Sequence, residues 1–333
     1  MRIAEINDIA SVASELSGGL RARGHYVEVI RPRLLGGSLP WMVKPVVGPV
    51  RAAEWAQIIR ELRNGRFDVI HIHYAYLGMI GLLGRFPYIL HCHGSDVRKI
   101  TPFTRPMVER AIAGAGRVYY ATPDLAKYVT AQRQDAEFLP NPVDAAEFRP
   151  AVPASSRNGV FICCSLTDIK GAGRIHRACR ILARERPDVR VTAIAGGVWT
   201  PHFAELPNVT LIPRQPRRAL PGIISEHGVA VGQAYLGAIG MSELEAMSCA
   251  RPLVAWFTYN GSYGQRPPIV RAVDGVDLAA NIARLVDDPV TRDELGASGR
   301  EWVMREHSLD GAAAIVEEAA LELLRRPPAA GAA

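Results

Sequence analysis

The feature of this sequence that most constrains its fold is a regular alternation of strand-like and helix-like segments, which occurs twice. Runs rich in β-branched and aromatic residues alternate with segments whose apolar residues recur at helical spacing. In the first half the strand-like runs are RIAEI, YVEVIRP, FDVIHIHYA, YILHCHG and GRVYYATP, and the helix-like segments are 12–24, 51–64 and 104–115. In the second half they are VFICCSL, VRVTAIAGG, VTLIP, VAVGQ and RPLVAW, with helices at 171–186, 217–226, 240–249, 277–304 and 311–325. This alternation predicts α/β domains in which helices cover a parallel sheet.

A stretch rich in proline and serine, RPAVPASSRNG, separates the two series and predicts the domain boundary. We therefore predict two doubly wound, Rossmann-like domains at 1–150 and 151–310. A helix at 311–326 follows, and the sequence leaves open whether it returns to the N-terminal domain. The tail at 327–333 is predicted to be disordered. Parallel sheets of this kind bind ligands at the carboxyl ends of their strands, so two facing domains predict an active site in the cleft between them.

Composition excludes several classes of protein. The chain of 333 residues has no secretory signal at its start and no apolar run long enough to span a bilayer, so we expect a cytoplasmic protein. Its five cysteines include no C-x-x-C pair, which argues against a disulfide framework. The net charge of +6 suits phosphorylated ligands or anionic lipid. We do not expect nucleic acid as a partner, because interleaved aromatics and nucleic-acid motifs are absent from the sequence.

The segment SLTDIKGAGRIHRACRILARERP is the first candidate for ligand binding. A strand ends near Ser165, a turn carries Lys170 and Gly171, and a helix begins. Gly171 allows the backbone to approach a ligand, and the free N–H groups of the helix N-terminus favour an anion. With the cation of Lys170, these groups suit a phosphate. The alternative is a solvated lysine in an ordinary strand–helix turn.

The segment LGAIGMSELEAMSCARPLVAW is the second candidate, because it brings two carboxylates into an otherwise apolar run. A helix starting at Gly240 would place Ser242 and Glu245 on one face. A carboxylate there can accept two hydrogen bonds from a vicinal diol such as ribose. The alternative is simple stabilisation of the helix dipole. We expect Glu243, on another face, to be solvated.

In combination, these segments resemble the family-4 glycosyltransferases, which have the GT-B fold and retain anomeric configuration. The resemblance covers nearly the whole chain. It rests on the lysine–glycine turn and on the glutamate followed by Ala-Met-small-Cys-small-x-Pro. It also rests on the segments LRARGHYVEVIRP, DVIHIHYA, LHCHGSD, LPNPVDAAEFRP and DDPVTRDELGASGREWVMREHSLD.

The resemblance implies a role for each matching residue. Lys170 would hold the donor diphosphate and act in catalysis, and Glu245 would hold the nucleotide ribose. His93, followed by Gly94 and Asp96, would reach the reacting sugar. Further implied positions are Gly171, Gly240, Met241 and Ser242 at the donor, Pro213 and Arg214 near the nucleobase, and Asn7, Asp8 and Asp96 on the acceptor side. The family is commonly metal-independent, so no metal and no cofactor are expected.

The chain departs from the family at three places. Gly237 stands where a second glutamate usually contacts the donor sugar. Ser165 stands where an arginine usually contacts the phosphates. The pair Asn7-Asp8 replaces two glycines in the first loop. Glu243 and Arg174 are candidate substitutes for the missing groups.

Two further features have alternative interpretations. His71, His73, His91 and His93, with Cys92, suggest a zinc site, but neither histidine pair adds a carboxylate or a second thiol, so we favour packed or hydrogen-bonded imidazoles. The amphipathic helix at 51–64 suggests either membrane docking or packing on the sheet, and we favour packing.

From the residues and the resemblance we predict a retaining glycosyltransferase that moves a sugar from a nucleotide-sugar donor. The acceptor is unidentified, with a small molecule, a lipid-linked substrate and a polysaccharide all compatible, and peripheral contact with the inner membrane face is left open. The alternatives are a sugar-nucleotide epimerase on the same fold and a non-catalytic partner of an active transferase.

Overall fold

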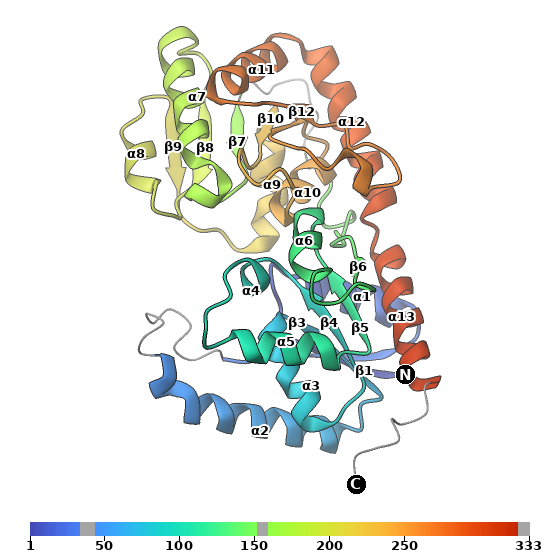
Figure 1. The fold of residues 1–333 in the computed structure, drawn as a ribbon. Coiled ribbons are helices and arrows are strands. Elements are labelled where there is room, and N and C mark those ends of the chain that lie inside the picture. Colours follow the sequence, from blue (N-terminus) through green and yellow to red (C-terminus); the bar gives the residue numbers. More distant parts are fainter. Residues whose placement is uncertain (34–43, 152–158, 326–333) are drawn as a thin grey trace. The chain divides into compact units, whose positions relative to one another are not determined.

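The computed structural model describes residues 1–33, 44–151 and 159–325 (Figure 1). The chain forms two compact units, the first made of Met1–Pro142 with the segment that starts at Leu309, and the second of Val143–Ser308. Most of the expected linker and the tail at 327–333 lie outside the described residues. The first boundary falls before residue 150 because Val143 already donates a backbone hydrogen bond to the oxygen of His307, at 2.9 Å.

The first unit is built on a six-stranded parallel sheet of order β2-β1-β3-β4-β5-β6 within the described residues. Its strands are β1 (Arg2–Ile6), β2 (Tyr26–Ile30), β3 (Val69–His73), β4 (Tyr88–Cys92), β5 (Arg117–Tyr120) and β6 (Glu137–Phe138). Its helices are α1 (Val12–Ala22), α2 (Gly48–Gly65), α3 (Gly78–Gly84), α4 (Ser95–Arg98), α5 (Arg105–Gly114), α6 (Ala126–Val129) and the C-terminal α13 (Leu309–Arg325). The strand order reverses between β1 and β3, which makes this edge the switch point of the sheet.

The second unit repeats the plan with the order β12-β11-β10-β7-β8-β9. Its strands are β7 (Val160–Ile162), β8 (Val191–Ile194), β9 (Val209–Ile212), β10 (Val229–Val231), β11 (Leu253–Ala255) and β12 (Val270–Arg271). Its helices are α7 (Ala172–Glu185), α8 (Thr200–Ala204), α9 (Leu220–Ser225), α10 (Met241–Ser248), α11 (Gly275–Asp287) and α12 (Pro289–Glu306). Here the order reverses between β7 and β10. Both sheets confirm the predicted doubly wound α/β fold.

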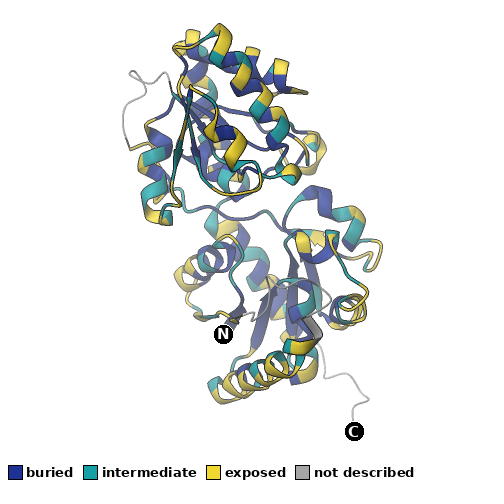
Figure 2. Ribbon diagram, turned by 90° about the vertical axis from the view of Figure 1, so that its left-hand side faces the viewer, coloured by how far each residue is buried: buried dark blue, intermediate teal, exposed yellow. Residues whose placement is uncertain are grey.

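Burial follows the layers of each unit. The central strands β3, β4, β7, β10 and β11 are buried along their whole length, and helices expose their outer faces (Figure 2). Strands covered on both faces are expected to be apolar throughout. The exceptions are His71, His73 and His91, which are fully buried in β3 and β4.

The long amphipathic segment predicted at 277–304 is two helices rather than one. Asp288 ends α11, and its side chain accepts a hydrogen bond from the backbone N–H of Thr291 at the start of α12. Pro289 follows at the first helical position, where its missing N–H costs nothing. Together the two residues separate the helices.

Candidate functional site

Lys170 and Gly171 lie in the segment that connects β7 to α7, and β7 is one of the two strands at the switch point of the second sheet. Lys170 ends a 3₁₀ turn, and Gly171 adopts a left-handed conformation with φ of 76° before α7 begins. A Cβ added to Gly171 would lie 2.7 Å from the carbonyl carbon of Ala234. The oxygen of Lys170 accepts a hydrogen bond from Ala234 N at 2.8 Å. Both the conformation and the close approach therefore require glycine.

The side chain of Lys170 extends to the N-terminus of α10. A Cβ added to Gly240, the residue before this helix, would lie 3.4 Å from Lys170 Nζ. The structure thus brings together the lysine–glycine turn and the start of the glutamate helix, which are far apart in sequence. An ammonium group beside the N-terminus of a helix is an environment that favours an anion.

Glu243 is buried, which corrects the expectation that it is solvated. Its carboxylate accepts hydrogen bonds from Gly240 N and Gln233 N, each at 3.1 Å, and from Ser242 Oγ at 3.2 Å. The side chain therefore caps α10 from within and fixes Ser242. Because these contacts occupy its oxygens, Glu243 is not arranged to replace the missing family glutamate.

Glu245 is also nearly buried and already has a cationic partner. Arg217, which lies just before α9, contacts Glu245 Oε1 at 2.9 Å. The same guanidinium contacts Glu147 at 3.1 Å and lies 4.6 Å from the ring centre of Phe148. The sequence analysis missed Arg217, because no local pattern links it to a glutamate on a later helix. A ribose at Glu245 would share the carboxylate with this arginine.

Gln233 is a second residue that the sequence analysis missed. Its side-chain oxygen accepts hydrogen bonds from the backbone N–H groups of Tyr235, Leu236 and Gly237, at 2.9, 2.6 and 3.3 Å. Its amide nitrogen donates to the oxygens of Ala238 and Trp256, at 2.9 and 2.7 Å. One buried amide therefore shapes the whole loop between β10 and α10. A polar residue at the end of a buried strand was the available signal.

The remaining predicted donor positions lie at the start of α10 and just after β9. Met241 is buried in the first turn of α10, whereas Pro213 and Arg214 are exposed after β9. A cavity of about 480 Å³ is lined by Pro213 but not by Arg214, together with Gly159, Arg190, Thr192, Thr210, Ile212, Gln215, Ile223, Glu226 and His227.

The two positions linked to the missing family arginine have other contacts. Ser165 is exposed, and its hydroxyl lies 3.4 Å from that of Thr167. Arg174 donates to the backbone oxygens of Ala234 and Val273, at 2.9 and 3.3 Å. Its guanidinium therefore stabilises the loops that contain Ala234 and Val273.

Asn7 and Asp8 follow β1 at the switch point of the first sheet. Asn7 has a left-handed φ of 72°, and its side chain donates to the oxygen of His73 at 2.9 Å. Asp8 accepts hydrogen bonds from Ser14 Oγ and Arg31, at 2.6 and 2.8 Å. Burial raises the pKa of Asp8, but these contacts outweigh it and lower the value overall. Both side chains stabilise the loop in place of the family's glycines.

Asp96 organises the turn that carries His93. Its carboxylate accepts hydrogen bonds from the backbone N–H groups of Ala75, His93 and Gly94, at 2.9, 3.1 and 2.6 Å. Burial raises the pKa of Asp96 overall, although the hydrogen bonds from the backbone N–H groups act to lower it. Asp96 therefore positions His93 through the backbone of this turn, and its place on the acceptor side stays a prediction.

The side chain of His93 belongs to a hydrogen-bonded series. His93 Nε2 lies 2.9 Å from His73 Nδ1, and His73 Nε2 lies 2.6 Å from Glu5 Oε2. Burial, with the neighbouring imidazoles of His73 and His71, lowers the pKa of His93 well below its ordinary value. Burial raises the pKa of Glu5, but the contacts with His71 and His73 lower it to about 2. Sequence analysis identified these histidines but not Glu5, the carboxylate they share.

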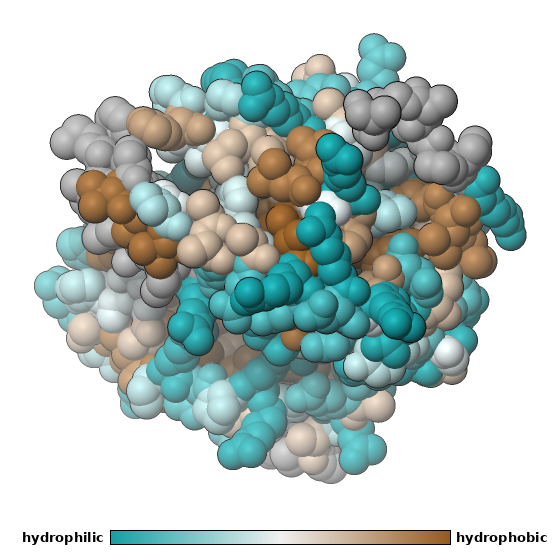
Figure 3. All heavy atoms as spheres, turned by 90° about the horizontal axis from the view of Figure 1, so that it is seen from below, coloured by the Kyte–Doolittle hydropathy of each residue, from teal (hydrophilic) through white to brown (hydrophobic). Residues whose placement is uncertain are grey.

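The amphipathic helix α2 uses its apolar stripe for packing, in agreement with the favoured interpretation. Ile58 and Leu62 are buried in the core of the first unit, and Trp55 and Ile59 pack against it. The face shown in Figure 3 mixes hydrophilic and hydrophobic side chains. Among the described helices, none is both long enough and apolar enough to cross a bilayer.

Two six-stranded parallel sheets with these strand orders define the class of this protein as a GT-B-type fold, and solved structures agree. Sucrose-phosphate synthase from Thermosynechococcus elongatus superposes with a TM-score of 0.75 and 16% identity, covering 97% of this chain and 99% of that one. HepE of Anabaena, solved in complex with UDP-glucose, gives 0.73 and 12% identity, covering 97% and 100%.

Sequence comparison finds similarity to one glycosyltransferase family. Residues 9–147 match the model of Glycosyltransferase Family 4. A D-inositol 3-phosphate glycosyltransferase of Pseudarthrobacter chlorophenolicus is 27% identical over 285 residues, which are 73% of this chain and 68% of that protein. These matches agree with the resemblance to glycosyltransferase family 4 that the motifs predicted, and the chain has the GT-B fold.

Proposed function

We propose that this protein transfers a sugar from a nucleotide-activated donor to an acceptor with retention of anomeric configuration, without a metal or cofactor at the donor site. The observation that carries the proposal is the position of Lys170 beside the N-terminus of α10, at the switch point of the second sheet. This is the edge of a doubly wound sheet at which ligands bind. A diphosphate is the ligand that suits a cation next to a helix N-terminus.

The proposed mechanism assigns charge stabilisation to this cluster. Bond cleavage at the anomeric carbon leaves negative charge on the departing diphosphate, which Lys170 and the helix N–H groups would stabilise. Glu245 would accept hydrogen bonds from ribose hydroxyls alongside Arg217. His93, held by Asp96 and His73, would contact the reacting sugar. The acceptor is a small molecule, a lipid-linked substrate or a polysaccharide, and nucleic acid is not among the proposed partners.

We also propose a cytoplasmic location, which the five free cysteines support. Peripheral contact with the inner membrane face is the alternative to a freely diffusing enzyme. Co-sedimentation with anionic vesicles separates the two, because only a membrane-docking protein would pellet with them.

A charge-removing variant tests the role of Lys170. Loss of a charge-assisted hydrogen bond costs about 1.5–3 kcal/mol, so Lys170→Met should weaken nucleotide-sugar binding about 10- to 100-fold. Thermal-shift screening against UDP-, GDP-, ADP-, CDP- and dTDP-sugars first identifies the donor, because a ligand bound only by the folded state raises the melting temperature. Calorimetry with that donor then gives the affinities.

Lys127→Met is the matched control, since Lys127 is an exposed lysine on α6. It should bind donor like the native chain. Native affinity in Lys170→Met, or no response to any nucleotide-sugar, would contradict the proposal.

A non-catalytic donor-binding partner of an active transferase is the second candidate. The observation in its favour is Gly237, which has no side chain where the family glutamate would contact the donor sugar, and whose backbone is left-handed with φ of 77°. Donor binding without hydrolysis or transfer, under conditions in which an active relative turns over, would favour this candidate.

A further inference from the structure

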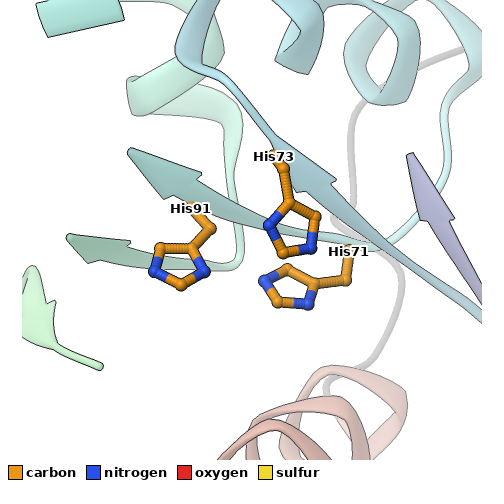
Figure 4. Close-up of side chains that lie close together, drawn as sticks. All are labelled: His71, His73 and His91. Atoms are coloured by element: carbon orange, nitrogen blue, oxygen red, sulfur yellow. The ribbon is translucent and has the colours of Figure 1, made fainter. Parts of the chain in front are cut away.

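Four side chains form a polar row across one face of the first sheet. In the register of the parallel strands, Glu5 of β1 pairs with His71 of β3, and His73 of β3 pairs with His91 of β4. All four are fully buried. The ring centroids of His71 and His73 lie 4.3 Å apart, and that of His91 lies 5.5 and 5.3 Å from them. Figure 4 shows the three rings directed toward one another.

Several ring nitrogens in this row have no hydrogen-bond partner among the described residues. They are Nε2 of His71 and both nitrogens of His91. A buried polar group without a partner costs about 1–3 kcal/mol, and buried imidazole nitrogens are ordinarily satisfied by protein, water or an ion. Because three buried nitrogens of this row lack a partner, we expect a ligand to bind there.

Glu5 determines which nitrogens are available. Its Oε2 lies 3.0 Å from Nδ1 of His71 and 2.6 Å from Nε2 of His73. Each of these nitrogens donates to the carboxylate, so the lone pair of each ring lies on the other nitrogen. A carboxylate that accepts the outer N–H of an imidazole is the usual outer partner of a metal-bound histidine.

We propose that His71, His73 and His91 bind one zinc ion, each through one ring nitrogen, with Glu5 as the outer carboxylate. The three residues offer ligand nitrogens that all lie within 4.8 Å of one another. Zinc–nitrogen bonds of about 2.0–2.1 Å place tetrahedral ligands roughly 3.4 Å apart, so small ring rotations complete the site. An all-imidazole set suits zinc, whereas calcium and magnesium prefer oxygen ligands.

The ion takes the place of the hydrogen bond between Nδ1 of His73 and Nε2 of His93, which lie 2.9 Å apart, and His93 keeps its proposed contact with the sugar. The site belongs to the first unit and its three histidines are inaccessible to solvent. The ion therefore ties β3 to β4 and, through Glu5, to β1. It is separate from the proposed diphosphate site at Lys170 and does not depend on that proposal.

The untagged full chain tests the site directly. We expect about one zinc per chain by elemental analysis after growth with zinc. After removal of the zinc by chelator, Co²⁺ should bind at one equivalent with the intense visible absorption of a tetrahedral nitrogen site, and added Zn²⁺ should raise the melting temperature.

His91→Phe is the critical variant. It removes two nitrogens but keeps a ring, and the ring of His91 makes no hydrogen bond among the described residues, so folding should be preserved. We expect this variant to lose stoichiometric zinc and the melting response, while His202→Gln, a change at an exposed histidine, retains both.

Glu5→Gln provides a second readout, because loss of an outer carboxylate typically weakens metal binding 10- to 100-fold. If His91→Phe fails to fold, Glu5→Gln tests the zinc site in its place. A native chain without zinc and without the cobalt spectrum would overturn the proposal. So would His91→Phe, or a folded Glu5→Gln, binding zinc as tightly as the native chain.

Discussion

At the scale of single residues, the conformation of Gly237 explains why a family feature cannot simply be restored. Its φ of 77° lies in the left-handed region, and an added Cβ would lie 2.5 Å from Thr258 Oγ1. Gln233 holds this conformation through the loop N–H groups. A glutamate here would need a different loop as well as a different side chain.

Gly237→Glu is therefore expected to lower the free energy of unfolding by about 1–2 kcal/mol, the usual cost of a left-handed non-glycine residue. Chemical denaturation measures the change. Gly237→Ala is the matched control, because it adds the backbone strain without the carboxylate and should lose a similar amount. Native stability in the glutamate variant would show that the loop adopts another conformation freely.

At the scale of elements, α1 and α13 pack closely because one glycine removes a side chain from their interface. A Cβ added to Gly19 would lie 2.7 Å from the oxygen of Leu309 and 2.9 Å from Cβ of Ala313. The neighbouring Gly18 is exposed and has open space around its Cβ position. Two adjacent glycines on one helix thus have opposite roles.

Gly19→Ala is expected to destabilise the protein by about 1–3 kcal/mol, because the added methyl group meets backbone that must shift. Gly18→Ala should stabilise it by about 0.5–1 kcal/mol, since alanine is the better helix former. Thermal unfolding of the two variants in parallel tests the pair. Equal effects in the two variants would contradict the close packing of α1 against α13.

At the scale of the whole molecule, the chain completes its first unit with its last helix. The second unit ends at Ser308, and α13 joins the first unit. Leu323 and Val316 are buried there, Arg23 pairs with Glu317 at 2.6 Å, and Arg117 pairs with Glu322. The first unit is therefore discontinuous in sequence.

Truncation after Ser308 should destabilise the first unit by at least about 3 kcal/mol, since burial of two large aliphatic side chains alone contributes that much. Hydrogen exchange measured on the truncated chain should show lost protection in β3, β4 and α1 while α7 and α11 stay protected. Loss of protection confined to the second unit would contradict the assignment of α13.

The sequence by itself predicted the two α/β repeats, the resemblance to family 4 and the candidate residues, because periodicity and turn chemistry are local properties. Lys170, Gly171 and Gly240 were identified from their neighbours along the chain. The helix break at Asp288-Pro289 also follows from local rules, although the predicted segment overlooked it.

Only the tertiary structure decided which of these residues meet. The pairing of Glu245 with Arg217, the burial of Glu243 and the row from Glu5 to His91 all join positions far apart in sequence. They depend on strand order and register, which set the neighbours of each side chain across the sheet. A local sequence pattern does not specify strand order, so the partners of each charged residue could be identified only from the assembled sheets.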